Sequence, residues 1–262
     1  VDKRQESARR SVGLRLDSPA CSVSCPFQAM ASAATSRKRK HEEVPETAGE
    51  VLTVQSRALD HLFTHMRDET TGSADFAFYS SRLMRILAEE GIALLPKEQR
   101  NIVCRGTKAA FQGEVVPLDN VCAVSIVRAG DSLLEAVRAC SPGMKVGKIL
   151  IQRDESTAEK LPKLFYCKLP PGVEHMHVLL VDPMLATGGS SKMAIQSLVD
   201  RGVREEHIIF LNVISCPEGL KAVHDTFPGV KILTTCIDQG MNDHKYIVPG
   251  LGDYGDRFFN TE

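Results

Sequence analysis

The segment from Val178 to Ser190 carries the residues best suited to chemistry, because an apolar run ends there in an acidic residue and a glycine-rich loop. Asp182 follows the apolar residues, and the sequence Ala-Thr-Gly-Gly-Ser at Ala186–Ser190 precedes a helical pattern. Adjacent glycines let backbone N–H groups converge on an anion, and a helix N-terminus adds about half a positive charge. The pattern predicts a phosphate-binding loop with Asp182 placed for a sugar diol. A tight turn capped by Ser190 is the alternative.

Two further apolar runs end in arginine. Arg128 follows residues 121–127 and is succeeded by Ala129 and Gly130, whose small size allows close backbone approach to a ligand. Arg153 follows residues 149–152 and opens a polar stretch that returns to apolar residues near Leu164. The Arg128 guanidinium presents a planar fork of donors that suits phosphate oxygens. An exposed surface charge is the plain alternative for each arginine.

The C-terminal segment Tyr246–Arg257 reads Tyr-Ile-Val-Pro-Gly-Leu-Gly-Asp-Tyr-Gly-Asp-Arg. Its glycines and proline do not continue a regular helix or strand, so a compact loop with exposed amides and carbonyls is expected. A planar base with alternating C=O and N–H groups could pair with such a backbone. An ordinary chain end would more often fray.

Taken together and in this order, the four segments closely resemble those of uracil phosphoribosyltransferases, which belong to the type I phosphoribosyltransferases. The resemblance covers residues 51–262. Most type I members have two adjacent acids at the end of the strand. Pro183 takes the second place here, which is typical of uracil members. Asp131 departs from the apolar residue that is frequent in bacterial members.

The resemblance implies that uracil attacks phosphoribosyl pyrophosphate (PRPP), giving UMP and pyrophosphate. Asp253, Arg128 and Arg153 would be catalytic, with Asp131 and Asp256 as alternative candidates for a general base. The residues expected to bind PRPP are Arg128, Ala129, Gly130, Arg153, Asp182, Pro183, Met184, Leu185, Ala186, Thr187, Gly188, Gly189, Ser190 and Asp253. The residues expected to bind uracil are Tyr246, Ile247, Gly252, Asp253 and Tyr254.

The family also implies Mg²⁺ bound mainly through PRPP, so no protein metal site is predicted. Some members respond to GTP, which is kept as a candidate effector, and members form homodimers or homotetramers. A self-associating surface would fit the N-terminal helices. Two other readings stay open: a phosphoribosyltransferase for another base, and a non-catalytic regulatory homologue that binds PRPP or UMP.

Strand and helix patterns alternate after Asn120, which predicts an α/β fold with a mostly parallel central sheet flanked by helices, the type I phosphoribosyltransferase fold. A projecting β-hairpin arm is expected between Lys148 and Leu169. Strands are predicted at 121–127, 148–152, 164–169, 178–181, 208–214 and 231–237. Helices are predicted at 132–139, 191–201 and 218–227.

Two N-terminal helices are expected before the alternating part. Val54, Leu59, Leu62, Phe63 and Met66 suggest the first. The second has an apolar face that includes Phe76 and Leu83. Ser73 is predicted to cap its start and Gly91 to end it.

Composition narrows the class of protein further. The formal net charge of −1 and the absence of a long apolar run argue against nucleic-acid and membrane partners. The eight cysteines are scattered without metal-ligand spacing, which suits reduced thiols in a cytoplasmic protein. Residues 1–50 are predicted to form a disordered tail, with 1–29 a possible leader, and 51–262 to form the enzyme domain. The basic run 37–40 is an alternative nuclear import signal.

Overall fold

The computed structural model describes residues 50–153 and 162–261. Their core is a sheet in the order β1-β10-β9-β7-β4-β5-β6, in which all neighbours are parallel except β5 and β6; β8 also pairs with β9. The strands of this sheet are β1 (Val51–Thr53), β4 (Val121–Val127), β5 (Lys145–Arg153), β6 (Pro162–Lys168), β7 (His177–Val181), β8 (Met184–Leu185), β9 (Ile208–Ser215) and β10 (Lys231–Ile237).

Side chains that alternate along the strands divide the core into two layers. On β7, Leu179 packs in one hydrophobic cluster, whereas Val178 and Leu180 pack in the other. On β9, Leu211 and Phe210 are divided in the same way. Successive side chains point to opposite faces of a strand, so a continuous apolar run indicates a strand covered on both faces. The predicted α/β class with a mostly parallel sheet is therefore confirmed.

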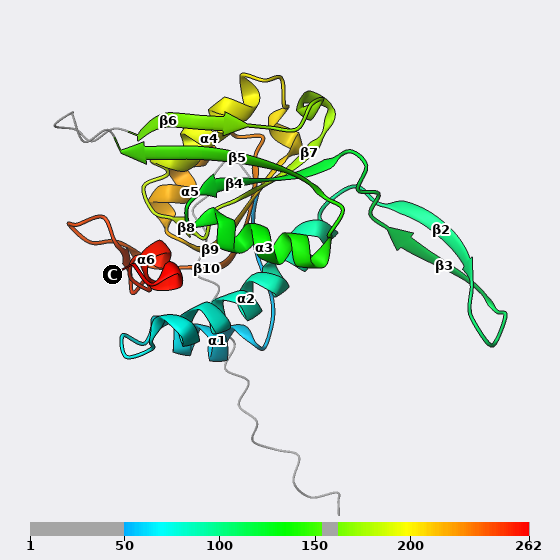
Figure 1. Ribbon diagram of the computed structural model, residues 1–262, viewed down its shortest axis with the longest axis horizontal. Coiled ribbons are helices and arrows are strands. Elements are labelled where there is room, and N and C mark those ends of the chain that lie inside the picture. The colour runs from blue at the N-terminus through cyan, green and yellow to red at the C-terminus, as the bar shows by residue number, and fades with distance from the viewer. Residues whose placement is uncertain (1–49, 154–161, 262) are drawn as a thin grey trace, which may run out of the picture. The chain divides into compact units, whose positions relative to one another are not determined.

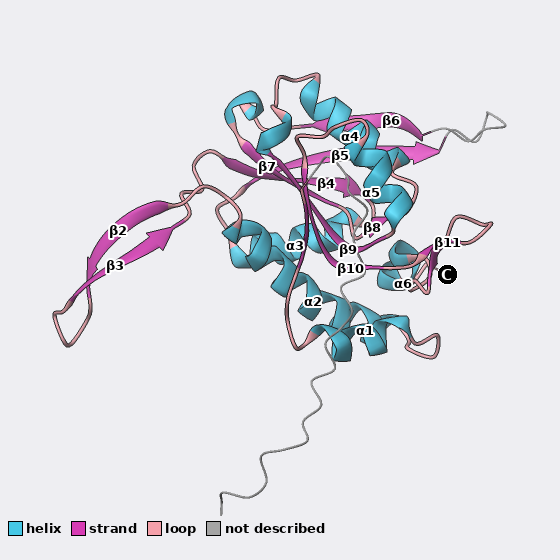
Figure 2. Cartoon of the chain, turned by 180° about the vertical axis from the view of Figure 1, so that it is seen from behind, coloured by secondary structure: helices cyan, strands magenta, loops and turns pink. Residues whose placement is uncertain are grey.

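Helices cover both faces, as Figures 1 and 2 show. Residues of α1, α2 and α3 pack in the first cluster, and residues of α4 and α5 pack in the second. The helices are α1 (Leu59–Arg67), α2 (Ser73–Ala93), α3 (Gly130–Cys140), α4 (Gly189–Val199), α5 (Pro217–His224) and the short C-terminal α6 (Tyr254–Phe259), with 3₁₀ turns at Val173–His175 and Glu205–His207. No helix in the described ranges is long and apolar enough to cross a membrane.

The second N-terminal helix differs from its prediction at both ends. Gly72 occupies the N-cap position without a side-chain bond, and Ser73 is already helical. Gly91 does not end α2, which continues to Ala93. Gly91 instead lies against Leu211 of β9, where a Cβ would come within 2.7 Å of the Leu211 Cδ1 atom. The glycine is needed for close packing of α2 on the sheet.

Two hairpins extend from this core, and only one was predicted. The antiparallel pair β5 and β6 forms the expected arm, although residues 154–161 at its tip lie outside the described residues. The other pairs β2 (Glu98–Val103) with β3 (Ala110–Val115) and reaches away from the sheet in Figure 1. Its largely exposed side chains lack the apolar alternation that identifies a half-buried strand, so no clear pattern predicts these two strands.

The structure does not test the predictions for the N-terminal tail. Residues 1–49, including the candidate leader and the basic run 37–40, lie outside the described residues. The division at residue 50 stays a prediction.

Gly91→Ala is expected to destabilise the protein. Alanine favours a helix by about 1 kcal/mol over glycine, but forcing a methyl group into a packed core costs about 1–3 kcal/mol. We therefore expect a net loss of about 1 kcal/mol in the free energy of unfolding, measured with urea. Gly143→Ala is the control, because a Cβ there meets no atom within 4 Å. A gain in stability for Gly91→Ala would show that Leu211 moves aside without cost.

Candidate active site

Two loops that follow the neighbouring parallel strands β4 and β7 adjoin at one edge of the sheet. Arg128–Gly130 follows β4, and Asp182 follows β7. A Cβ on Gly130 would collide with the carbonyl oxygen of Val181 and lie 3.0 Å from Ser125 Oγ. Glycine at position 130 therefore lets the first loop pack directly against the end of β7.

The glycine-rich loop after β7 is fixed by the next strand. The Val213 N–H donates to the Pro183 carbonyl at 3.0 Å, which ties the loop to β9. Gly188 adopts a left-handed conformation (φ 76°) at the N-cap of α4, and Gly189 begins that helix. The N–H groups and hydroxyl groups of Thr187–Ser190 thus gather at a helix N-terminus, where an anion is stabilised.

Asp182 occupies the predicted place at the end of β7. Burial raises the pKa of the Asp182 carboxyl to about 7, and a hydrogen bond from the Met184 N–H opposes that rise without cancelling it. The Asn212 side-chain amide donates to the Asp182 carbonyl at 3.1 Å, so the backbone is anchored to β9. A carboxyl group that titrates near neutrality has a charge that ligands can alter.

A buried ion pair holds the C-terminal loop in place. Arg67, at the end of α1, donates to Asp238 Oδ1 and Oδ2 at 2.7 and 2.8 Å and to the Gly250 carbonyl at 2.7 Å. The Gly250 N–H in turn donates to Asp238 Oδ2 at 2.8 Å. One ion pair thus satisfies both the N–H and the carbonyl of Gly250, which follows the cis Val248–Pro249 peptide.

Asp253 and Tyr254 have separate roles at the start of α6. Asp253 is the N-cap, and its carboxylate accepts the Asp256 N–H at 3.0 Å. The Tyr254 ring is buried against Phe76, and its hydroxyl lies 3.5 Å from Met84 Sδ. The Asp253 carboxylate is therefore oriented by the cap, whereas the Tyr254 ring serves chiefly to anchor the loop.

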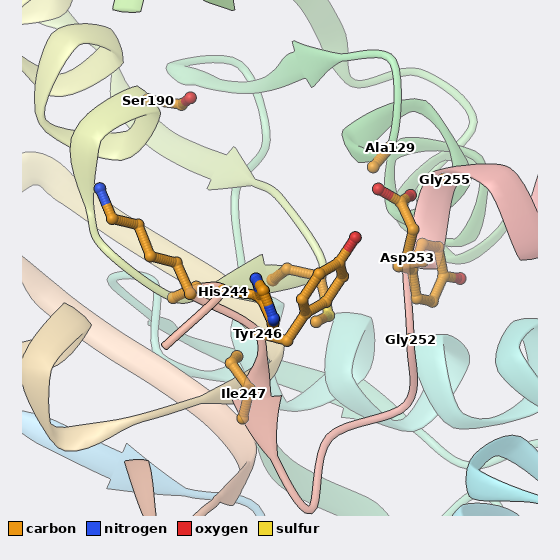
Figure 3. A pocket seen from close by; sticks show the side chains of 12 residues that line it. Ala129, Ser190, His244, Tyr246, Ile247, Gly252, Asp253 and Gly255 are labelled. Carbon is orange, nitrogen blue, oxygen red and sulfur yellow. The ribbon is translucent and has the colours of Figure 1, made fainter. Parts of the chain in front are cut away.

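These segments line an open cavity of about 450 Å³ (Figure 3). Its wall includes Ala129 from the first loop, Ser190 from the glycine-rich loop Ala186–Ser190 and the predicted uracil residues. The full lining consists of Ala129, Met184, Ala186, Ser190, His244, Lys245, Tyr246, Ile247, Gly252, Asp253, Tyr254 and Gly255. All five residues expected to bind uracil thus border one space with part of the expected PRPP site.

Of the two predicted arginines, the structure describes the side-chain contacts of Arg128 alone. Arg128 does not line the cavity; its guanidinium donates to Asp256 Oδ1 at 2.6 Å and to Thr261 Oγ1 at 2.9 Å. Thr261 Oγ1 also donates to the Asp256 carboxylate at 2.7 Å, so the three groups form one cluster. Arg153 is the last residue of β5, and the polar stretch after it lies outside the described residues.

Asp131 is held by two partners in the first turn of α3. Ser125 Oγ donates to one carboxylate oxygen at 2.6 Å, and Lys148 Nζ lies 2.9 Å from the other. The group therefore links α3 to β4 and β5. The hydrogen bond from Ser125 and the ion pair with Lys148 give the Asp131 carboxylate a structural role.

Sequence reasoning missed four residues of the site: Arg67, Asp238, His244 and Lys245. Asp238 directly follows β10, so a search of every strand end would have found it. Arg67 carried no signal, because a basic residue in the last turn of a helix is ordinary. His244 and Lys245 lie in the loop that directly precedes the segment Tyr246–Arg257.

Comparison with known proteins agrees with the geometry. A family model described as "Uracil phosphoribosyltransferase" matches residues 53–261. The chain is 45% identical over 219 residues to "Uracil phosphoribosyltransferase 1" of Schizosaccharomyces pombe, covering 84% of this chain and 98% of the relative. It is 49% identical over 208 residues to "Uracil phosphoribosyltransferase" of Saccharomyces cerevisiae, covering 79% of this chain and 94% of that relative. A solved structure, the AQ2163 protein from Aquifex aeolicus, is 27% identical with a TM-score of 0.70, covering 81% and 99%.

Asp182→Asn is expected to stabilise the protein in a pH-dependent way. The folded pKa of about 7 exceeds the ordinary value of 3.8, so the stabilising effect of protonation is lost as pH rises through 7. At pH 8 the variant should gain on the order of 1–3 kcal/mol in unfolding free energy, and the gain should shrink steadily towards pH 4. Urea unfolding across this range measures it.

Asp119→Asn, at an exposed position, is the matched control and should show no comparable trend. If wild type and Asp182→Asn differed in unfolding free energy by the same amount at every pH, the raised pKa of Asp182 would be contradicted.

Proposed function

The chain belongs to the uracil phosphoribosyltransferase family, and from that premise we propose that it transfers the phosphoribosyl group of PRPP to uracil, giving UMP and pyrophosphate. The observation that carries this proposal is the shared cavity. The phosphate loop contributes Ser190 to its wall, and the base loop contributes Ile247, Gly252 and Asp253. Two substrates that must react with each other require such a common space.

The phosphate loop and Asp182 bind the ribose phosphate. Thr187–Ser190 offers N–H and hydroxyl donors to the 5′-phosphate at the start of α4, and the carboxylate of Asp182 accepts hydrogen bonds from ribose hydroxyls. Because the pKa of Asp182 is raised to about 7, binding that requires the ionised form releases a proton below that pH.

Uracil is bound by the segment from Tyr246 to Tyr254. Main-chain donors and acceptors of this loop complement the alternating C=O and N–H groups of the base, and the half-exposed Tyr246 ring offers a face for stacking. The Arg67–Asp238 pair fixes the Gly250 turn, so these main-chain groups are held ready for the base.

Charge builds on the departing pyrophosphate, and Arg128 and Arg153 are proposed to stabilise it. Arg128 has five N–H donors, and Asp256 and Thr261 accept hydrogen bonds from two of them. Asp256 therefore leaves part of the guanidinium fork for pyrophosphate oxygens. No covalent nucleophile is needed.

Mg²⁺ suits this site as a companion of PRPP. In the described ranges no group of three or more His, Cys, Asp or Glu side chains gathers to hold a metal, and Asp253 is the single carboxylate among the cavity residues. This donor set fits a cation that keeps its waters and binds mainly to phosphates. When bound, Mg²⁺ would neutralise pyrophosphate charge.

Assembly and regulation stay predictions. A homodimer or homotetramer is supported by exposed apolar side chains on the β2–β3 hairpin, such as Val103 and Phe111, and by Phe78 on α2. GTP remains a candidate effector, and cytoplasmic localisation remains an expectation.

UMP formation from uracil and PRPP with Mg²⁺ tests the proposal directly. We expect turnover with uracil, and not with cytosine, hypoxanthine or orotate. Asp253→Asn should lower kcat by about ten- to a hundredfold if the charge assists proton transfer, while stability is kept because asparagine caps a helix as well as aspartate does. Asp119→Asn, at an exposed position outside the cavity, is the control.

The outcomes separate the alternatives. Turnover with another base alone would contradict uracil specificity and keep the PRPP site. PRPP binding without any turnover would favour a regulatory homologue. Full activity of Asp253→Asn would remove its charge from the mechanism.

A further inference from the structure

A short loop between β11 (Gly240–Met241) and β12 (Ile247–Val248) brings a lysine to the cavity. The Asn242 side-chain carbonyl accepts the N–H groups of His244 and Tyr246, each at 3.0 Å, and its main-chain carbonyl accepts the Lys245 N–H at 2.8 Å. The loop is thus closed on itself by one asparagine, and its position follows from the β11–β12 pairing.

Lys245 adopts a conformation that lysine disfavours. Its φ is 65°, in the left-handed region where glycine is the usual residue. Ordinary side chains in this region are strained, and such residues gather at binding sites. The backbone conformation at position 245 favours glycine, yet a lysine side chain is present there and lines the cavity.

The charge of Lys245 is also unmatched. It is the one lysine or arginine among the residues that line the cavity. Lys148 is paired with Asp131, and Lys221 with Asp225, but no hydrogen bond or ion pair of the Lys245 ammonium is found within 50–153 and 162–261. The ammonium is available to an anionic ligand.

The loop Ala186–Ser190 has no cationic side chain of its own. Ala186–Ser190 supplies N–H and hydroxyl donors but no charged side chain, whereas a bound phosphate monoester carries close to two negative charges. Arg128 is engaged with Asp256 outside the cavity lining. Figure 3 shows Ser190 and the loop of His244 and Tyr246 around the same space, and Lys245 lines it with them.

We propose that the ammonium of Lys245 binds the 5′-phosphate of PRPP and of the product UMP, so that the 242–246 loop completes the phosphate site. The inference rests on the proposed function. An ammonium of Lys245 bound to that phosphate would link residues 242–246 to Ala186–Ser190 through one side chain.

Lys245→Gln and Lys245→Gly test the charge. Both should raise the KM for PRPP and the Kd for UMP, measured by calorimetry, about five- to twentyfold, because a charge-assisted hydrogen bond is lost at an exposed site. The KM for uracil and kcat should change by less than about twofold. Lys245→Arg should recover most of the affinity, and added salt should weaken UMP binding more in wild type than in Lys245→Gln.

Two comparisons separate binding from folding. Lys245→Gly relieves the positive φ, so its stability should equal or exceed that of wild type while its phosphate affinity falls. Lys231→Gln is the matched control, since Lys231 begins β10 and is paired with Glu50.

Wild-type turnover is measured first. If the proposed function is wrong, the wild-type protein will not form UMP. If only the role of Lys245 is wrong, wild type will be active and the variants will keep their affinity for PRPP and UMP. Unchanged PRPP and UMP affinities in Lys245→Gln would overturn it. An equal rise in the KM for uracil would also overturn it, because the loss would then belong to the loop as a whole.

Discussion

The ion pair between Arg67 and Asp238 is the interaction on which the candidate active site most depends. Burial alone would raise the pKa of Asp238, but the hydrogen bonds from Arg67 and the Gly250 N–H outweigh burial and hold the pKa below its usual range. The Asp238 side chain is only 4% exposed, so losing Arg67 would leave a buried charge, which typically costs about 3–5 kcal/mol. The same pair fixes Gly250, and through it the part of the cavity wall that the C-terminal loop forms.

A second arginine extends this support along the same loop. Arg257 donates to the carbonyls of Leu251 and Met66 at 2.7 and 2.6 Å, and its guanidinium lies 4.2 Å from the centre of the Phe76 ring. The C-terminal loop is therefore tied to the end of α1 and to α2, elements formed almost two hundred residues earlier. Main-chain groups that recognise a base must be held still, and side chains from distant elements hold them here.

The sheet supplies the opposite wall. The carboxyl ends of parallel strands lie at one edge of a sheet. The geometry of the sheet alone therefore brings the loops after β4 and β7 together. Gly130 allows the close approach, and hydrogen bonds from β9 fix the phosphate loop. The cluster of Arg128, Asp256 and Thr261 then joins this wall to the C-terminal segment.

The sequence by itself determined the α/β class, the strand at 121–127, the strand-end positions of Arg128 and Asp182, and the resemblance to the family. These follow from local chemistry: an apolar run indicates a buried strand, and glycines beside hydroxyls indicate an anion loop. Only the tertiary structure decided that Gly91 packs on Leu211, that Arg67 holds the base loop and that Arg128 meets Asp256. It also decided that Lys245 shares a cavity with Ser190. Such contacts join residues far apart in the chain, and no local pattern specifies which distant partner a side chain will meet.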